Sequence, residues 1–517
     1  MSHEQLQILE RQLWSIANLL RGKMNADEYK NYILGFIFYK YLSQKQELYA
    51  NELLQEDELK YIELEDEEII EDIKEESLEN LGFFLRPNEL FGYLVKKGKG
   101  ELGKDTFILE DLKKALIAIE DRAYERESSE DFVGVFEDVD LSSPKLGKTP
   151  EAKNALIVDI FSRLDEIDFD IKNPKSDILG QAYEYLIGQF AAGAGKKGGE
   201  FYTPAQVSRI LAQIVTLGKE RIKEVYDPTC GSGSLLIRVG EYAKVAHYYG
   251  QELNRTTYNL ARMNMILHNI PYTQFSIRQG DTLEEDKFID LKAEAIVANP
   301  PFSAKWKGQE DSLLKQDERF TPYGALAPKN KADYAFVTHM LHHLADDGVM
   351  AVVLPHGVLF RGGAEGKIRR AIIEKFNYLD AVIGLAPNLF YGTSIPACIL
   401  VFKKCKEEDN ILFIEASKLY EKGKNQNYLK DEHIQKILDT YKERKEIEKF
   451  SHLATIKEIK ENDFNLNIPR YVDTFEEEEP IDIDEVAKAI KEIESQEKEV
   501  DAKIESFCKE LGIATPF

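Results

Sequence analysis

The chain has 517 residues, of which 43% are hydrophobic and 31% are charged. This length suggests roughly two to four domains, and the composition excludes a globally disordered protein. Acidic residues outnumber basic ones by 92 to 67, which gives a formal net charge of −25. Because general nucleic-acid binding depends on a basic surface, this charge counts against a protein that holds DNA or RNA over its whole surface.

The sequence carries no signal for membrane insertion, secretion or a structural metal. No apolar run reaches the roughly 18–20 residues of a membrane span, and the first residues lack the basic and then apolar pattern of a signal peptide. The four cysteines lie far apart without a C-x-x-C pair, which argues against a disulfide framework and a zinc ribbon. We expect a cytoplasmic protein with no metal site.

Residues 1–170 carry the three- and four-residue spacing of apolar side chains that is typical of amphipathic helices. The pattern starts at Leu6, breaks at Asn25–Asp27 and gives way to loop signals over residues 138–153. Residues 56–79 are strongly acidic and predict a helix with a solvated face. We therefore expect an N-terminal helical domain over residues 1–170.

From about residue 220, short β-branched and apolar runs alternate with helical patterns. The expected strands lie in the runs over residues 221–227, 274–281, 293–301, 348–355, 379–385 and 397–404, with one more ending at Glu252. Strands spaced in this way predict a sheet with helices on both faces. The fold class is therefore α/β, with a Rossmann-like domain over residues 171–417.

Residues 418–517 return to helical patterns. Within residues 480–512, apolar side chains follow a 4-3 spacing that skips only Glu497, which is typical of a coiled-coil seam. The seam residues are Val486, Ile490, Ile493, Val500, Ile504, Phe507 and Leu511. A helix that docks on a partner and a helix that packs on its own domain fit this pattern equally well.

A glycine-rich turn follows the first strand of the α/β domain. Asp227 ends the strand, and Gly231, Ser232, Gly233 and Ser234 lead into a helical pattern over residues 235–249. Glycines let the backbone approach a ligand closely, and a helix N-terminus offers free N–H groups. No Lys-Ser/Thr pair follows, so the turn is not a phosphate-binding Walker loop.

Two further carboxylates are expected beside Asp227. Glu252 lies 25 residues further on, where Rossmann-like folds place the acid that binds ribose hydroxyls, and Asp281 follows the third strand. Because parallel strands end at one edge of a sheet, the three acids should converge on one crevice. Together they suit a ligand with an amine, a diol and an aminopurine edge, such as S-adenosyl-L-methionine. Each acid taken alone fits a helix cap or a surface position more simply.

The fourth strand ends in Asn299, Pro300, Pro301 and Phe302, where the prolines stiffen the backbone. An exocyclic amine on an aromatic ring is a poor nucleophile, because its lone pair is delocalised. The Asn299 side-chain oxygen and the Pro300 carbonyl can accept its two hydrogens, while Phe302 stacks on the ring. The tetrapeptide thus predicts methyl transfer to such an amine, and a base in duplex DNA must be flipped out to reach it. A strand-ending turn with a buried phenylalanine is the simpler alternative.

In this order of motifs the sequence resembles the γ-class N6-adenine DNA methyltransferases. More narrowly, it resembles the modification (methyltransferase) subunits of type I restriction–modification systems. The matching segments are residues 13–18, 32–42, 199–204, 227–234, 299–302, 331–336, 353–357 and 388–396. Their combination is far more specific than the tetrapeptide, which also occurs in methyltransferases that act on glutamine or guanine amines.

The resemblance implies roles for further residues of the cofactor site. It implies that two segments close over the methionine part of the cofactor. Their residues are Glu200, Phe201, Tyr202, Thr203, Pro204 and Ala205, together with Ser232, Gly233 and Ser234. It also implies that Glu252 holds the ribose and that Asp281 contacts the adenine.

The resemblance further implies a complex in which two such subunits flank one specificity subunit that recognises duplex DNA. A restriction subunit joins for cleavage, and methylation protects the host DNA. Residues 480–512 would dock on the specificity subunit, and the N-terminal domain would clamp DNA or that partner. Basic segments at residues 305–307, 329–331 and 361–370 are either local DNA contacts or solvated loops.

Two alternatives stay open at this point. One is an amino-methyltransferase that acts on protein glutamine or on RNA, and the long N-terminal helical region counts against it. The other is a non-catalytic, cofactor-sensing scaffold. The intact Asp227, Glu252 and Asn299–Phe302 count against this second alternative.

Overall fold

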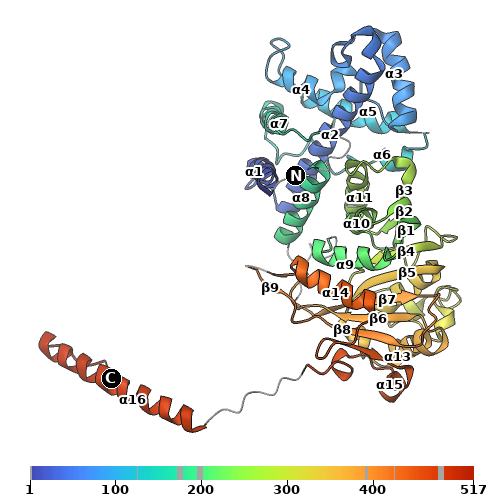
Figure 1. Cartoon of the computed structure of the whole chain (residues 1–517). Coiled ribbons are helices and arrows are strands. Elements are labelled where there is room, and N and C mark those ends of the chain that lie inside the picture. Colours follow the sequence, from blue (N-terminus) through green and yellow to red (C-terminus); the bar gives the residue numbers. More distant parts are fainter. Residues whose placement is uncertain are drawn as a thin grey trace. The chain divides into compact units, whose positions relative to one another are not determined.

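The structure, a computed structural model, describes residues 3–124, 126–171, 178–194, 202–390, 394–423, 426–474 and 483–516. The chain divides into two units, Met1–Val472 and Asp473–Phe517, each of which is described by itself (Figure 1). Among the helices of these described residues, none is long and apolar enough to cross a membrane.

The N-terminal region is helical, which confirms the prediction. Its helices are α1 (His3–Leu20), α2 (Ala26–Leu53), α3 (Glu67–Asn80), α4 (Phe91–Gly98), α5 (Leu109–Ala123), α6 (Ser129–Phe132), α7 (Pro150–Asp165) and α8 (Ile178–Ala194). The predicted break lies between α1 and α2, where the Asn25 amide donates to Glu28 Oε2 at 3.1 Å. The acidic stretch forms α3, and Asp66 caps it by accepting from the amides of Glu68 and Ile69.

A nine-stranded mixed sheet forms the α/β part. Its strands are β1 (Arg221–Asp227), β2 (Lys244–Glu252), β3 (Phe275–Gln279), β4 (Ala293–Ala298), β5 (Leu344–Pro355), β6 (Leu379–Gly384), β7 (Ala397–Lys403), β8 (Ile411–Glu415) and β11 (Ser451–Ala454). Their order is β11-β8-β6-β7-β5-β4-β1-β2-β3. Within it, β7 runs antiparallel to both β5 and β6, whereas β1 to β5 pair in parallel and β6 pairs in parallel with β8.

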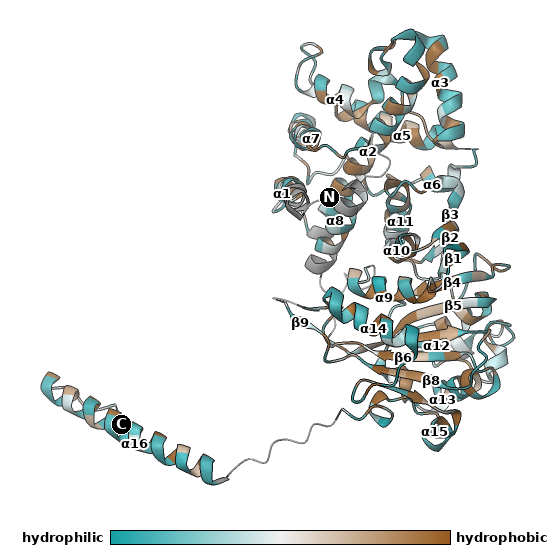
Figure 2. Cartoon of the chain, in the orientation of Figure 1, coloured by the Kyte–Doolittle hydropathy of each residue, from teal (hydrophilic) through white to brown (hydrophobic). Residues whose placement is uncertain are grey.

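Helices cover both faces of this sheet, as predicted. They are α9 (Ala205–Val215), α10 (Ser234–Gly240), α11 (Arg255–Leu267), α12 (Asp333–His343), α13 (Gly363–Arg370), α14 (Asp431–Glu443) and α15 (Ile456–Glu461). Alternate strand residues enter two separate cores: Val297 and Val353 pack on the side of α9 to α11, and Ile296 and Val352 on the side of α12 and α13. Figure 2 shows the resulting hydrophobic strands.

Two sequence predictions within this region were wrong in detail. The helical pattern assigned to residues 235–249 is helix only as far as Gly240, because β2 begins at Lys244. Residues 418–472, predicted as part of a helical C-terminal region, contribute β11, which pairs antiparallel with β8. This stretch also contains α14 and the short hairpin of β9 (Glu421–Lys422) and β10 (Asn427–Tyr428). The predicted limit at residue 417 therefore cuts through a continuous sheet.

Helix α11 joins the α/β part to the N-terminal helices. Arg262 is buried, and its guanidinium donates to the carbonyls of Glu130 and Val133 at 2.8 and 2.9 Å. Tyr41 donates to the Ile266 carbonyl at 3.1 Å. Since α11 starts three residues after Glu252, the last residue of β2, the helical region is anchored next to the expected cofactor site.

The unit Asp473–Phe517 contains one long helix, α16 (Ile483–Leu511), in agreement with the predicted C-terminal helix.

Candidate active site

The predicted site residues follow four neighbouring parallel strands. Asp227 and Glu252 end β1 and β2, Asp281 comes two residues after β3, and Asn299 comes directly after β4. The strand order reverses between β4 and β1, since β2 and β3 lie on one side and β5 on the other. Open α/β sheets bind ligands in the crevice at such a switch point.

The turn after β1 needs glycine at two positions. Gly231 and Gly233 have φ values of 55° and 77°, in the left-handed region that glycine adopts without strain. Gly233 precedes the first residue of α10, and the Gly231 amide donates to Glu252 Oε2 at 3.0 Å. The hydroxyls of Ser232 and Ser234 lie 3.0 Å apart. The glycines thus bring the turn against the end of β2.

Asp227 is a buried carboxyl group with a strongly shifted pKa. Burial raises its pKa to about 8, and the charge of Glu252 adds to this shift. Its Oδ1 accepts from the Thr229 amide at 2.9 Å. Burial likewise raises the pKa of Glu252, whose Oε1 accepts from the Asn254 amide at 2.8 Å. A buried acid and a half-buried acid close together favour a cationic ligand, because a cation stabilises their ionised forms.

Asn299 and Thr203 meet across this crevice. The Asn299 Nδ2 donates to Thr203 Oγ1 at 3.2 Å, which directs the amide oxygen the other way. That oxygen is buried and has no hydrogen-bond partner among the described residues. An unpaired buried acceptor is costly, and this oxygen is available to accept a hydrogen bond from a ligand.

These residues enclose a cavity of about 20 Å³, which has room for about one water molecule. It is lined by Tyr202, Thr203, Asp227, Thr229, Cys230, Gly231, Ser232, Ser234, Leu235 and Asn299. The structure therefore brings the Gly-Ser-Gly turn, the segment before α9 and the start of the tetrapeptide together.

Among the other predicted residues that the structure describes, none lines this cavity. Asp281 Oδ1 accepts from the Leu283 amide at 3.0 Å and so caps a turn. Pro204 precedes α9, and Ala205 is its first residue. Glu200 and Phe201 fall outside the described residues.

Burial raises the pKa of Cys230 well above its ordinary value, so its thiol is a poor nucleophile.

A second aromatic ring faces the tetrapeptide. Phe390 lies edge-on to Phe302, with ring centroids 5.9 Å apart and planes at 65°. Phe302 is half-buried and Phe390 is buried. Sequence reasoning did not assign Phe390 a role, although it lies in the segment 388–396 that carries the family resemblance.

Two arginines of the basic segments proposed as DNA contacts are structural. The buried Arg369 donates to the carbonyls of Phe464, Val358 and Arg361, and Arg361 pairs with two buried acids. Trp306 is buried against Phe320. Among the exposed lysines of the other two segments, Lys307 pairs with Glu284 and Lys329 with Glu310. The interpretation as a free basic patch is therefore wrong for Arg361 and Arg369.

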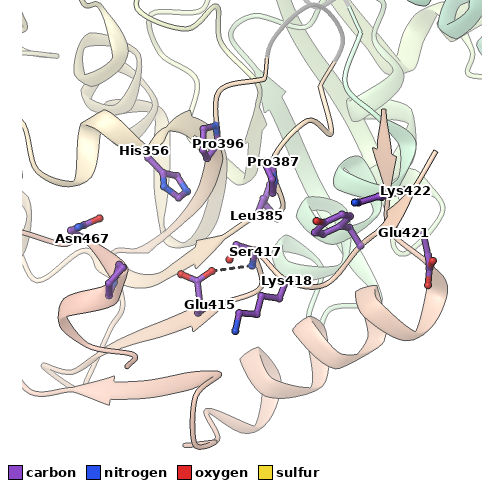
Figure 3. A pocket seen from close by; sticks show the side chains of 12 residues that line it. His356, Leu385, Pro387, Pro396, Glu415, Ser417, Lys418, Glu421, Lys422 and Asn467 are labelled. Atoms are coloured by element: carbon purple, nitrogen blue, oxygen red, sulfur yellow. Dashed lines mark hydrogen bonds between the residues drawn. The ribbon is translucent and has the colours of Figure 1, made fainter. Parts of the chain in front are cut away.

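A larger pocket, of about 810 Å³, opens at the same edge of the sheet (Figure 3). His356, Leu385 and Glu415 lie at the carboxyl ends of β5, β6 and β8, which run parallel to β4. Lys418 and Lys422 lie among its walls, as do two acids. The charges are mixed, so the pocket does not select a ligand by charge.

In the described residues, Asp286, His339 and His343 are grouped closely enough to suggest a metal site. Hydrogen bonds already occupy these groups: His343 Nε2 bonds Asp286 at 2.9 Å, and the Arg319 guanidinium donates to His339 Nδ1 at 3.0 Å. His339 Nε2 lies 2.9 Å from the Tyr226 hydroxyl. A guanidinium beside a ligand nitrogen disfavours a cation, and the group is better described as a buried hydrogen-bond network beneath β1.

Comparisons with known proteins agree with this architecture. The family described as N-6 DNA Methylase matches residues 174–480, and the HsdM N-terminal domain matches residues 9–164. The methylase subunit of the type I restriction enzyme MpnII from Mycoplasma pneumoniae is 36% identical, covering 99% of this chain and 97% of the relative.

Solved structures give the same result. The methyltransferase subunit of a type I restriction-modification system from Streptococcus thermophilus has a TM-score of 0.83 and 44% identity, covering 90% of this chain and 100% of that one. A chain from a type I R-M complex has a TM-score of 0.62 at 20% identity and covers 98% of both chains, which supports the fold. The chain therefore belongs to the N-6 DNA methylases and, within them, to the methylase subunits of type I restriction–modification systems, which are adenine-specific DNA methyltransferases.

Proposed function

We propose that this chain transfers a methyl group from S-adenosylmethionine to N6 of an adenine flipped out of duplex DNA. The observation that carries the proposal is the buried Asn299 Oδ1, which has no partner among the described residues while Nδ2 is held by Thr203. The amide is thus oriented so that its oxygen is ready to accept from an amine that enters the site. The adenine N6 amine is such a donor.

The residues of the crevice fit the proposed cofactor. S-adenosylmethionine supplies the methyl group from a positively charged sulfonium. The buried Asp227 offers a carboxylate for a cationic group, and Glu252 lies where a ribose diol binds in Rossmann-like folds. We assign Ser232–Ser234 and Glu200–Ala205 to the methionine part of the cofactor. We assign Asp281 to its adenine ring.

Asn299 and Phe302 would orient the target base. The Asn299 oxygen and the Pro300 carbonyl accept the two amine hydrogens, which favours a pyramidal nitrogen with its lone pair directed at the methyl group. Phe302 packs on the base, and the edge-on Phe390 limits how far Phe302 can turn. Flipping costs a few kcal/mol of lost stacking and pairing, which these contacts must offset.

Tritiated S-adenosylmethionine tests this function directly. The chain, co-purified with its specificity subunit, should transfer label to unmodified DNA, and digestion should release N6-methyladenine. Protein and RNA in the same reaction should stay unlabelled. Label on protein would support the glutamine alternative, and a complex that binds cofactor without ever labelling DNA would support the scaffold.

We further propose that the chain works in a complex of two methylase subunits and one specificity subunit, which a restriction subunit joins, and that methylation protects the host DNA. Because its substrate is the cell's own DNA, we place the reaction in the cytoplasm. The specificity subunit would supply the DNA grip that a chain of net charge −25 lacks, and the N-terminal helices would clamp DNA or that partner.

The seam of α16 supports docking on the specificity subunit. The described seam side chains are largely exposed, with Ile493 at 63% and Phe507 at 62%. A continuous apolar stripe on a charged helix suits a partner helix that offers a matching stripe.

Charges placed on this seam should prevent assembly. We expect the double variant Ile493→Glu and Val500→Glu to lose at least about 100-fold in affinity for the specificity subunit, because two buried contacts would become buried charges. The same substitution on the opposite face, Ser495→Glu with Ala502→Glu, is the matched control and should assemble normally. Co-purification and analytical ultracentrifugation measure both. Equal assembly of the two variants would show that the seam is not the docking surface.

A further inference from the structure

Ser303, the residue directly after the tetrapeptide, has an unusual backbone conformation. Its φ is 53°, in the left-handed region that residues with a Cβ atom rarely adopt. The Ser303 amide donates to Asp333 Oδ1 at 2.8 Å, and its hydroxyl lies 3.4 Å from Asp333 Oδ2. These contacts hold the chain in this conformation and so fix the direction in which Asn299–Phe302 leaves β4.

Asp333 is itself held in place by a buried ion-pair cluster. It is the first residue of α12, and its side chain is fully buried. The Arg361 Nη2 donates to Asp333 Oδ2 at 2.6 Å, and the same guanidinium donates to both oxygens of Glu365 at 2.6 and 2.8 Å. Glu365 is also buried. The carboxylate of Asp333 therefore cannot turn away from Ser303 without leaving the half-buried Arg361 guanidinium partly unpaired and its own buried charge without a cation.

The cluster also explains why glycine occupies position 357. A Cβ atom there would lie 2.3 Å from Arg361 Nη1 and would displace the guanidinium. Residues 331–336 and 353–357, which carry the family resemblance but have no place in the proposed chemistry, thus meet at one point. There they hold Ser303 and, through it, the tetrapeptide Asn299–Phe302.

We propose that Asp333, clamped by Arg361 and Glu365, is a positioning residue for methyl transfer that sets the orientation of Asn299 through the Ser303 amide. The inference rests on the proposed function, because it concerns the geometry of the same site. Asp333 acts on the loop backbone, and none of its hydrogen bonds described above involves the cofactor turn. It should therefore affect the rate of transfer much more than the binding of cofactor.

The test uses the complex with the specificity subunit. Asp333→Ala should lower kcat by about 100-fold, the loss that a displacement of about 1 Å produces in an aligned site. The Kd for S-adenosylmethionine should change by less than about threefold. In the Asp333→Ala background, Ser303→Gly should recover part of the rate, at least about threefold, because glycine adopts a φ of 53° without external support. A residue that only stabilised the fold would not respond in this way.

Asp380→Ala is the matched control. Like Asp333, Asp380 is a buried acid in an ion pair, but its partners, Arg444 at 2.8 Å and Lys403 at 2.9 Å, join β6 to β7 and to the residue after α14. This variant should lower the thermal midpoint like Asp333→Ala while kcat stays within about twofold.

The outcomes separate the inference from the function on which it rests. A wild-type complex that does not methylate DNA contradicts the function itself. An active wild type with an equally active Asp333→Ala contradicts the positioning role, and so does a loss of rate that Asp380→Ala reproduces. If Asp333→Ala does not fold, Asp333→Asn replaces it, since the amide keeps an acceptor oxygen for Ser303 but pairs poorly with Arg361.

Discussion

Asn299→Ala is expected to reduce methyl transfer by about 100- to 1,000-fold while cofactor affinity stays within about threefold. The side-chain oxygen at this position is buried and has no partner among the described residues, so its main interaction is with an entering donor. Without it the amine keeps its lone pair delocalised in the ring and loses its alignment with the methyl group. Single-turnover rates on a duplex with one target adenine measure the loss, and equilibrium binding of the cofactor measures what is retained.

Thr203 provides a graded control for this prediction. Thr203→Ser keeps the hydroxyl that accepts from Asn299 Nδ2 and should keep the rate within about threefold. Thr203→Val removes this acceptor but leaves the Asn299 oxygen, so its rate should fall between those of Thr203→Ser and Asn299→Ala. Undiminished single-turnover rates in Asn299→Ala would rule out the assigned mechanism.

Much of the sheet could be predicted because its strands are short apolar runs bounded by turns. The predicted strand over residues 221–227 matches β1 at both ends. The error at β2 has a physical cause: Val245 and Tyr248 are three residues apart, a spacing that fits a helix, although buried and more exposed residues mostly alternate there as in a strand. β11 was missed because four residues with mixed polarity carry little periodic signal.

The acids and the asparagine could be located because each follows a strand, and parallel strands end at one edge. Contacts between residues that are distant in the sequence could not be predicted in this way. Phe390 meets Phe302 only through folding, and the acids that neutralise Arg361 lie 28 residues before it and four after it. A pattern of basic residues shows the charge at a position but not whether a buried carboxylate lies beside it. This is why Arg361 was grouped with surface cations.

The titration of Asp227 should make both the stability of the folded chain and its affinity for the cofactor depend on pH. In the folded chain its pKa is about 8, whereas an unfolded aspartate titrates near about 3.9. Between these values the folded chain holds a proton that the unfolded chain has released. The free energy of unfolding therefore falls as pH rises from about 4 to about 8, and the penalty is complete above pH 8. A cationic ligand favours the ionised carboxylate, so its binding must release this proton.

Cofactor affinity should accordingly rise with pH up to about 8, by at most about tenfold per unit, and then level off. Asp227→Asn should bind S-adenosylmethionine about 10- to 100-fold more weakly, since a charged contact is lost, and the rise linked to Asp227 should disappear. Without cofactor, the same variant should have a higher thermal midpoint than the wild type at pH 8.5, because a neutral amide avoids the cost of a buried charge. Calorimetry in two buffers with different ionisation enthalpies counts the released protons.

Adenosine is the matched ligand for this measurement, because it has the ribose and the adenine but no cationic group. Its affinity should differ by less than about threefold between the wild type and Asp227→Asn, if Asp227 serves the cationic part alone. Equal weakening of both ligands would mean that the substitution distorts the Gly231–Ser234 turn. If S-adenosylmethionine bound the wild type with the same affinity from pH 6 to 8.5 without proton release, Asp227 would not face a cation. In that case the methionine part of the cofactor would have to be placed elsewhere in the crevice.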